Sequence, residues 1–227
     1  MTKRGPQGRQ LAERVRTARG RTVASSRWLQ RQLNDPYVAE AKRRGYRSRA
    51  AFKLLEIDEK VRLLRRGMAV VDLGAAPGGW TQVAAERVGA ADGDGRVVAV
   101  DILEMGAVPG AKVLRLDFLA DEAPATVKAA GGGDVDVVLS DMAPSTTGHP
   151  ETDHLRIMGL AEAALAFAVE VLRPGGAFVT KIFQGGGEHE FDRELRRCFA
   201  TVRRIKPPAS RAESSEFYFV ATGFRGA

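Results

Sequence analysis

The sequence contains little of what disulfide-stabilised, metal-binding or membrane proteins are built from. Its 227 residues include one cysteine, Cys198, and three histidines, which stand at no metal-ligand spacing. No apolar run approaches the ~18 residues that span a bilayer, and the basic N-terminus lacks the apolar segment of a secretory signal. A disulfide framework, a metal centre and a membrane span are therefore not expected. We expect a cytoplasmic, monomeric chain without a metal.

The basic residues are concentrated at the N-terminus. Residues 1–53 hold 15 Lys and Arg against 3 Asp and Glu, a net charge of +12, whereas residues 54–227 hold 20 against 25, a net charge of −5. Charges that serve only solubility would be spread along the chain, so the asymmetry favours a nucleic-acid-binding segment. An acidic protein partner, or a tail that only keeps the chain in solution, is the alternative, and we place nucleic acid ahead of both.

The length suits one domain with an appendage. Residues 1–24 are Arg-rich, weakly apolar and interrupted by glycine, which is typical of a flexible basic extension. We expect a single domain over residues 25–227, with helices that carry basic residues in 25–60. Pro36 near the first position and Gly45 at the end delimit one of these helices, and Ser48 is the expected N-cap of the next.

Beyond these helices, apolar runs alternate with helical patterns. This alternation predicts an α/β fold with a doubly wound, mostly parallel, seven-stranded sheet of the Rossmann-like type. Runs such as 135–139 are apolar enough for a sheet covered on both faces. The last two strands have no helix between them, so we expect one to be antiparallel, at or near an edge. The expected strands are 68–73, 96–101, 112–116, 135–140, 176–183, 201–205 and 217–222, and the expected helices are 79–88, 121–130, 153–172 and 188–199.

A glycine-rich turn follows the first expected strand. Residues 72–80 read Asp-Leu-Gly-Ala-Ala-Pro-Gly-Gly-Trp and lead into a helical pattern. A turn of this kind presents bare N–H groups and a helix N-terminus to a ligand. Ala76 stands where the dinucleotide fingerprint has the glycine that lies against a pyrophosphate. The turn therefore favours an adenosine ligand without pyrophosphate, for which S-adenosylmethionine is the candidate. A nicotinamide-dependent oxidoreductase, and a turn that binds nothing, are the alternatives.

Polar side chains stand at the ends of the following strands, where ligands of doubly wound sheets gather. Asp101 is suited to the hydroxyls of an adenosine ribose, and Asp117 to the amino group of adenine. Asp141 and Lys181 end the next two strands and should project into one cleft. A lysine can take a proton from a hydroxyl acceptor, but only in its neutral form. The alternative is a structural Asp–Lys ion pair between the two strands.

Five motifs together make the resemblance specific. The chain resembles the FtsJ/RrmJ (RlmE) family of ribosomal RNA 2′-O-methyltransferases, in order and without large gaps, from about Ser25 to the C-terminus. The resemblance implies a class I fold that uses S-adenosylmethionine. The motifs are Ser-Arg-Ala-Ala-Phe-Lys-Leu at 48–54, the glycine-rich turn at 71–80, Ser-Asp-Met-Ala-Pro at 140–144, Val-Thr-Lys-Ile-Phe-Gln-Gly at 179–185, and the closing segment 210–223.

The same resemblance implies the roles of individual residues. The Lys-Asp-Lys-Glu tetrad of the family falls on Lys53, Asp141, Lys181 and Glu216, with Glu213 as the rival for the last place. Lys181 would be the base for the ribose hydroxyl, or only an electrostatic clamp, and Asp141 would orient it. Lys53 and Glu216 would position the nucleotide. The implied cofactor contacts are Gly74, Gly78, Trp80, Asp101, Asp117 and Asp141.

The expected partner is structured RNA. The resemblance implies a uridine in the A-loop of 23S ribosomal RNA within the assembled 50S subunit. Transfer RNA or another RNA as substrate, and a catalytically silent ribosome-assembly factor, are the alternatives. The residues expected to bind RNA are Arg27, Arg31, Lys42, Arg43, Arg44, Arg47 and Arg49.

Overall fold

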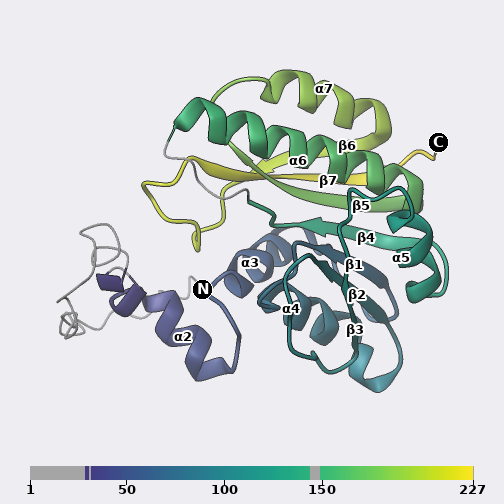
Figure 1. Cartoon of the computed structure of the whole chain (residues 1–227), viewed down its shortest axis with the longest axis horizontal. Helices are drawn as coiled ribbons and strands as arrows, with labels where there is room; N and C mark the ends of the chain where they lie inside the picture. The colour runs from purple at the N-terminus through teal and green to yellow at the C-terminus, as the bar shows by residue number, and fades with distance from the viewer. Residues whose placement is uncertain (1–28, 31, 144–148, 227) are drawn as a thin grey trace.

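The computed structural model describes residues 29–30, 32–143 and 149–226. Within these residues, seven strands form one sheet in the order β3-β2-β1-β4-β5-β7-β6 (Figure 1). The strands are β1 (Ala69–Leu73), β2 (Arg96–Asp101), β3 (Ala111–Arg115), β4 (Val135–Ser140), β5 (Leu172–Phe183), β6 (Phe199–Ile205) and β7 (Glu216–Phe224). The α/β fold and the seven-stranded sheet expected from the sequence are therefore confirmed. The expected basic extension 1–24 lies outside the described residues.

The pairing of the strands explains which residues meet at the sheet's edge. β1 pairs in parallel with β2 and β4, and the parallel pairing continues to β3 on one side and β5 on the other. β7 runs antiparallel between β5 and β6, and β6 is the edge strand. The predicted antiparallel strand near an edge is thus β7. Because its direction is reversed, β7 begins where β5 ends, and Glu216 pairs with Phe183.

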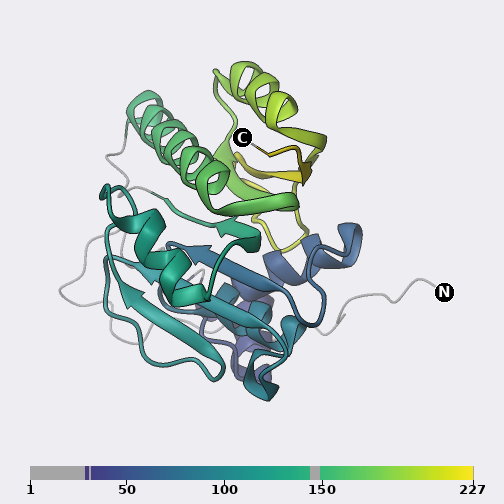
Figure 2. The ribbon, with the colours of Figure 1, turned by 90° about the vertical axis from the view of Figure 1, so that its right-hand side faces the viewer.

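Helices cover both faces of the sheet (Figure 2). α5, α6 and α7 pack on one face around Phe178 and Phe219, and α3 and α4 pack on the other around Val179 and Val220. These pairs alternate along β5 and β7, as side chains of a strand covered on both faces must. The helices are α2 (Pro36–Arg44), α3 (Ala51–Val61), α4 (Gly79–Val88), α5 (Ala123–Gly131), α6 (Pro150–Val171) and α7 (Glu188–Cys198), with a 3₁₀ turn, η1 (Ala90–Asp92).

The two N-terminal helices agree only partly with their sequence signals. α2 begins at Pro36 after Asp35, whose carboxylate accepts the Tyr37 N–H, and it ends at Gly45 with φ of +76°. The prediction that Ser48 caps α3 was wrong, because α3 begins at Ala51 with Ala50 as its N-cap and no side-chain cap. Backbone carbonyls of residues 48–50 already accept the first N–H groups, so the start of α3 does not use the Ser48 hydroxyl.

Candidate active site

The glycine-rich turn leaves β1 at the carboxyl edge of the sheet and enters α4. Gly74 and Gly78 have φ of +71° and +110°, a backbone conformation that side chains rarely allow. A Cβ on Gly74 would in addition collide with the side chain of Met142, beyond β4. The turn therefore requires glycine at both positions to bring its backbone against neighbouring elements.

The strand-end acids lie beside this turn. One oxygen of Asp101 accepts the Ala76 N–H at 2.8 Å and the other accepts the Leu103 N–H at 2.7 Å. Asp117 accepts the Leu119 N–H at 3.0 Å. Asp101 thus ties the end of β2 to the turn after β1, as expected of groups that share the carboxyl edge of a parallel sheet.

Asp72 is an acid that sequence analysis did not assign to the site. It is buried in β1, and its carboxyl group accepts the Thr81 hydroxyl at 2.7 Å. Its pKa rises to about 7, first because of burial, and further because of the charges of Asp141 and Asp101. The carboxyl groups of β1, of β2 and of the segment after β4 are therefore close enough to interact.

This donor set can be tested against the expected ligand. Carboxylates accept hydrogen bonds from ribose hydroxyls and amino groups and attract a cationic sulfonium, whereas they repel a phosphate. The acids at this edge fit S-adenosylmethionine, whose ribose hydroxyls, amino groups and sulfonium each suit a carboxylate. Asp101, Asp117 and the turn residues Gly74 and Gly78 are the ones that would hold it.

Trp80 occupies a different place from the turn's other residues. Its side chain is buried, and its indole N–H donates to the Ala50 carbonyl at 2.8 Å. The ring packs against Tyr218, with ring centroids 5.6 Å apart. Trp80 therefore joins α4 to α3 and β7 as part of the core, and its contact with a cofactor stays a prediction.

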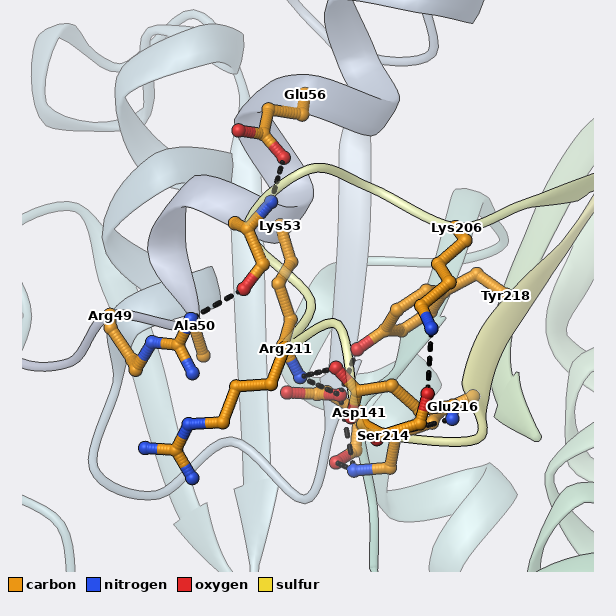
Figure 3. A network of polar contacts seen from close by, with 12 residues as sticks. Arg49, Ala50, Lys53, Glu56, Asp141, Lys206, Arg211, Ser214, Glu216 and Tyr218 are labelled. Carbon is orange, nitrogen blue, oxygen red and sulfur yellow. Dashed lines mark hydrogen bonds and ion pairs between the residues drawn. The ribbon is translucent and has the colours of Figure 1, made fainter. Parts of the chain in front are cut away.

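Four side chains, called here the catalytic cluster, meet at the carboxyl edge of the sheet: Lys53, Asp141, Lys181 and Glu216. Figure 3 shows Lys53, Asp141 and Glu216 of this cluster. Lys181 at the end of β5 donates to the Asp141 carbonyl at 2.6 Å and lies 3.1 Å from its Oδ1. Lys53 on α3 lies 2.8 Å from Glu216 Oε1 and 3.9 Å from Asp141 Oδ1. One set of ion pairs thus joins α3, β5, β7 and the segment after β4. Glu213, the rival for the last place, lines the same cleft as Glu216, but Glu216 is the acid that pairs with Lys53.

The lysine charges in the cluster stabilise the ionised form of Asp141. Burial is the largest influence on Asp141 and opposes its ionisation. The ammonium groups of Lys181 and Lys53, together with hydrogen bonds, outweigh burial and hold the pKa of Asp141 below its ordinary value. Asp141 is therefore a carboxylate at neutral pH and can orient the Lys181 amine.

Tyr218 is a member of the site that sequence analysis missed. Its hydroxyl donates to Asp141 Oδ1 at 2.6 Å, and its ring is fully buried. The alternation of side chains along β7 was the available signal, because residues two apart on a strand share a face. Tyr218 therefore lies on the same face as Glu216, next to the catalytic cluster.

The basic residues expected to bind RNA divide into two groups. Lys42, Arg43 and Arg44 are exposed on the last turn of α2, where Arg43 and Arg44 also pair with Glu40. Arg47 and Arg49 also make contacts within the protein, and their binding to RNA stays a prediction. The Arg47 guanidinium donates to the carbonyls of Pro77, Gly106 and Ala107, and that of Arg49 pairs with Asp35 at 3.1 Å. Arg27 and Arg31 lie outside the described residues.

The part of the chain that the structure describes contains no helix long and apolar enough to cross a membrane. In the same residues, no group of three or more His, Cys, Asp or Glu side chains is arranged to hold a metal ion.

Comparison with known proteins finds a matching family and close similarity to named relatives. The FtsJ-like methyltransferase family matches residues 46–224. The chain is 59% identical over 223 residues to ribosomal RNA large subunit methyltransferase E of Xanthobacter autotrophicus, covering 98% of this chain and 88% of that protein. It is 62% identical over 226 residues to the protein of the same name from Paramagnetospirillum magneticum, covering 98% and 93%. Among solved structures, a protein from Plasmodium falciparum assigned as a ribosomal RNA methyltransferase superposes with a TM-score of 0.72 at 27% identity, covering 80% of this chain and all of that one.

Proposed function

Because the chain belongs to the FtsJ-like methyltransferase family, we propose that it methylates a ribose 2′-oxygen of large-subunit ribosomal RNA with S-adenosylmethionine as the donor. Relatives at 59% and 62% identity carry the name ribosomal RNA large subunit methyltransferase E. The observation that carries the proposal is the catalytic cluster beside the glycine-rich turn, two lysines and two acids in one cleft. The substrate nucleotide we propose is a uridine of the 23S A-loop in the assembled large subunit.

The cofactor brings the methyl group already activated as a sulfonium. The protein's residues then have two tasks, which are to align the 2′-oxygen and to take up its proton. Alignment falls to Lys53 and Glu216, whose 2.8 Å ion pair forms one wall of a cleft also lined by Arg49 and Arg211.

Proton uptake falls to Lys181. A neutral lysine amine has two N–H bonds and one lone pair. Asp141 offers two acceptors to Lys181, its carbonyl at 2.6 Å and Oδ1 at 3.1 Å. With both N–H bonds directed at Asp141, the lone pair points away from it and can accept the proton of the 2′-hydroxyl. Asp141 is thus the residue that orients the base.

A substitution of Lys181 tests this role. Lys181→Arg keeps the charge, but a guanidinium is effectively never neutral and cannot accept the proton. We expect kcat to fall by about 10²-fold or more, the usual contribution of proton transfer, with little change in cofactor binding. Labelled methyl transfer to large subunits from cells that lack the protein measures the rate. Lys112→Arg, at an exposed position of β3, is the matched control. A normal rate for Lys181→Arg would make Lys181 an electrostatic clamp.

The wild-type protein tests the function itself. Mapping of 2′-O-methyl groups in ribosomal RNA from cells without the protein should show one unmethylated position in the large subunit that is methylated in normal cells. Calorimetry should show binding of S-adenosylmethionine and none of a nicotinamide cofactor. Binding to large subunits without methyl transfer would instead indicate a silent assembly factor, and loss of a methyl group from transfer RNA would move the substrate to that class.

A further inference from the structure

A second cavity lies next to the catalytic cluster, at the ends of β5 and β6 and the beginning of β7. Its volume is about 420 Å³, within the range of small-molecule and cofactor sites. Apart from Ile205, it is lined by polar and charged side chains and one aromatic ring. The lining residues that matter here are Gln184, Glu188, His189, Arg204, Lys206 and Phe217.

A stacked pair of side chains forms one wall of this cavity. The guanidinium carbon of Arg204 lies 5.4 Å from the centroid of the Phe217 ring and 4.9 Å from that of Phe219. Phe219 is fully buried, and Phe217 is partly exposed. The two rings hold the exposed guanidinium in a cation–π arrangement. Unpaired nucleobases stack on guanidinium planes and aromatic rings, so this wall suits a base.

The other lining groups suit the polar parts of a nucleotide. Lys206 donates to the Ser214 carbonyl at 2.7 Å (Figure 3) and to the Ala212 carbonyl at 3.3 Å. These bonds fix its ammonium beside the cavity, where it can attract a phosphate. Glu188 accepts the Gly185 N–H at 3.0 Å, and this hydrogen bond leads the effects that lower its pKa. Its carboxylate, with the Gln184 amide, can bond to the edge of a base.

The cavity and the catalytic cluster are built from the same segments. Phe217 directly follows Glu216, and the two side chains project to opposite faces of β7. Gln184 directly follows β5 and lies three residues beyond Lys181, a distance of about 10 Å at ~3.3 Å per extended residue. The Gln184 N–H donates to the Ser215 carbonyl at 3.0 Å, which ties the end of β5 to the residue before Glu216. An RNA strand with one ribose in the catalytic cluster can therefore reach the cavity with a neighbouring nucleotide.

We propose that this cavity binds an unpaired nucleotide next to the methylated one in the RNA substrate, with its base on the Arg204–Phe217 pair and its phosphate near Lys206. The inference rests on the proposed function, because it assigns a second subsite for the same RNA. It gives a role to the Arg204 guanidinium, which lies over two rings at the edge of the sheet and which the catalytic cluster does not use.

Removal of the stacking guanidinium tests the subsite. Arg204→Ala should raise the KM for large subunits about 10-fold or more while kcat stays within twofold. The base stacks on Arg204 equally in the bound substrate and in the transition state, so its loss weakens binding without slowing the chemical step. Arg203→Ala is the matched control, since it removes the same charge from the next residue of β6, which points to the other face. Equal kinetics for the two variants would overturn the subsite.

Phe217 offers a second, independent readout. Phe217→Leu keeps an apolar side chain and should raise KM in the same direction as Arg204→Ala, with thermal unfolding as the check that the variant folds. A photoreactive benzoylphenylalanine at position 217 should crosslink to a ribosomal RNA nucleotide adjacent to the methylated one. A crosslink to a ribosomal protein would overturn the proposal in favour of a protein contact.

These results are separable from the proposed function. If the wild-type protein transfers no methyl group to large subunits, the proposed function fails. If the wild-type protein is active and Arg204→Ala behaves as Arg203→Ala does, only the subsite fails.

Discussion

At the scale of single residues, Tyr218 explains how Asp141 is held in place. Its buried hydroxyl donates to Asp141 at 2.6 Å, and burial, followed by the charges of Asp141 and Glu216, raises its pKa well above the ordinary value. The hydroxyl is therefore always a donor. Tyr218→Phe should lower kcat about 10-fold, the effect of losing one hydrogen bond to a charged group. Tyr46→Phe is the control, because the Tyr46 hydroxyl bonds to Glu86 instead. A rate equal to that of the control would show that the lysines alone orient Asp141.

Asp72 makes a residue-scale prediction for stability against pH. Its pKa is about 7 in the folded protein, raised by burial, against an ordinary value of 3.8. Between these two values the folded state binds more protons than the unfolded state, so its contribution to stability falls as the pH rises from about 4 to 7. Asp72→Asn keeps an acceptor for Thr81 and cannot ionise. Urea unfolding at pH 5 and pH 8 should show that the variant gains stability relative to wild type at the higher pH. A constant difference between the two proteins would contradict the raised pKa.

At the scale of elements, α3 holds the loop between β6 and β7 that leads to Glu216. Glu56 on α3 accepts the Ala209 N–H at 2.6 Å, and Arg49 donates to the Ala209 carbonyl at 2.6 Å. Glu56 also accepts the Tyr37 hydroxyl at 3.0 Å, which adds α2 to the same arrangement. The loop is therefore fixed on both sides of one residue, and α3 supplies Lys53 while it orients the loop that supplies Glu216.

Removal of the Glu56 carboxylate should loosen this loop. Glu56→Ala leaves the Ala209 N–H without its acceptor, and we expect faster hydrogen exchange over residues 206–215 and a fall of about 10-fold in kcat/KM. Glu59→Ala, at an exposed position on the same helix, should change neither. Unchanged exchange in the Glu56 variant would mean that Arg49 alone holds the loop.

At the scale of the whole molecule, the N-terminal residues 1–53 carry a net positive charge, and part of this charge lies on the last turn of α2. Lys42, Arg43 and Arg44 are exposed there. If these residues neutralise phosphates, changing all three to Gln should reduce the slope of log K against log salt by about 2, at ~0.7–0.9 for each phosphate that is no longer neutralised. Filter binding of large subunits between low and moderate salt measures the slope.

A second triple variant is the control. Changing Arg62, Arg65 and Arg66, exposed residues before β1, to Gln removes the same charge and should leave the slope unchanged. Equal slopes for the two triple variants would exclude phosphate binding by α2.

Local pattern was enough to predict the fold and the strand-end residues of the candidate site. The alternation of apolar runs and helical spacing predicted the seven strands, and the absent helix before the last strand predicted the antiparallel neighbour of the edge. The glycine-rich turn and the acids at strand ends were readable for the same reason, since both depend on residues adjacent in the chain. Asp141 and Lys181 were readable as strand-end residues, whereas Lys53 and Glu216 were implied only by the family resemblance.

Only the tertiary structure decided which of these side chains meet and which are used elsewhere. Tyr218 reaches Asp141 across 77 positions of sequence, and Arg47 directs its donors to carbonyls 30 to 60 positions away. The Ser48 hydroxyl, a good cap by its residue type, was left unused because backbone carbonyls reached the N–H groups first. Such contacts depend on strand order and register, which bring residues far apart in the sequence into contact. No local pattern encodes which of them will meet.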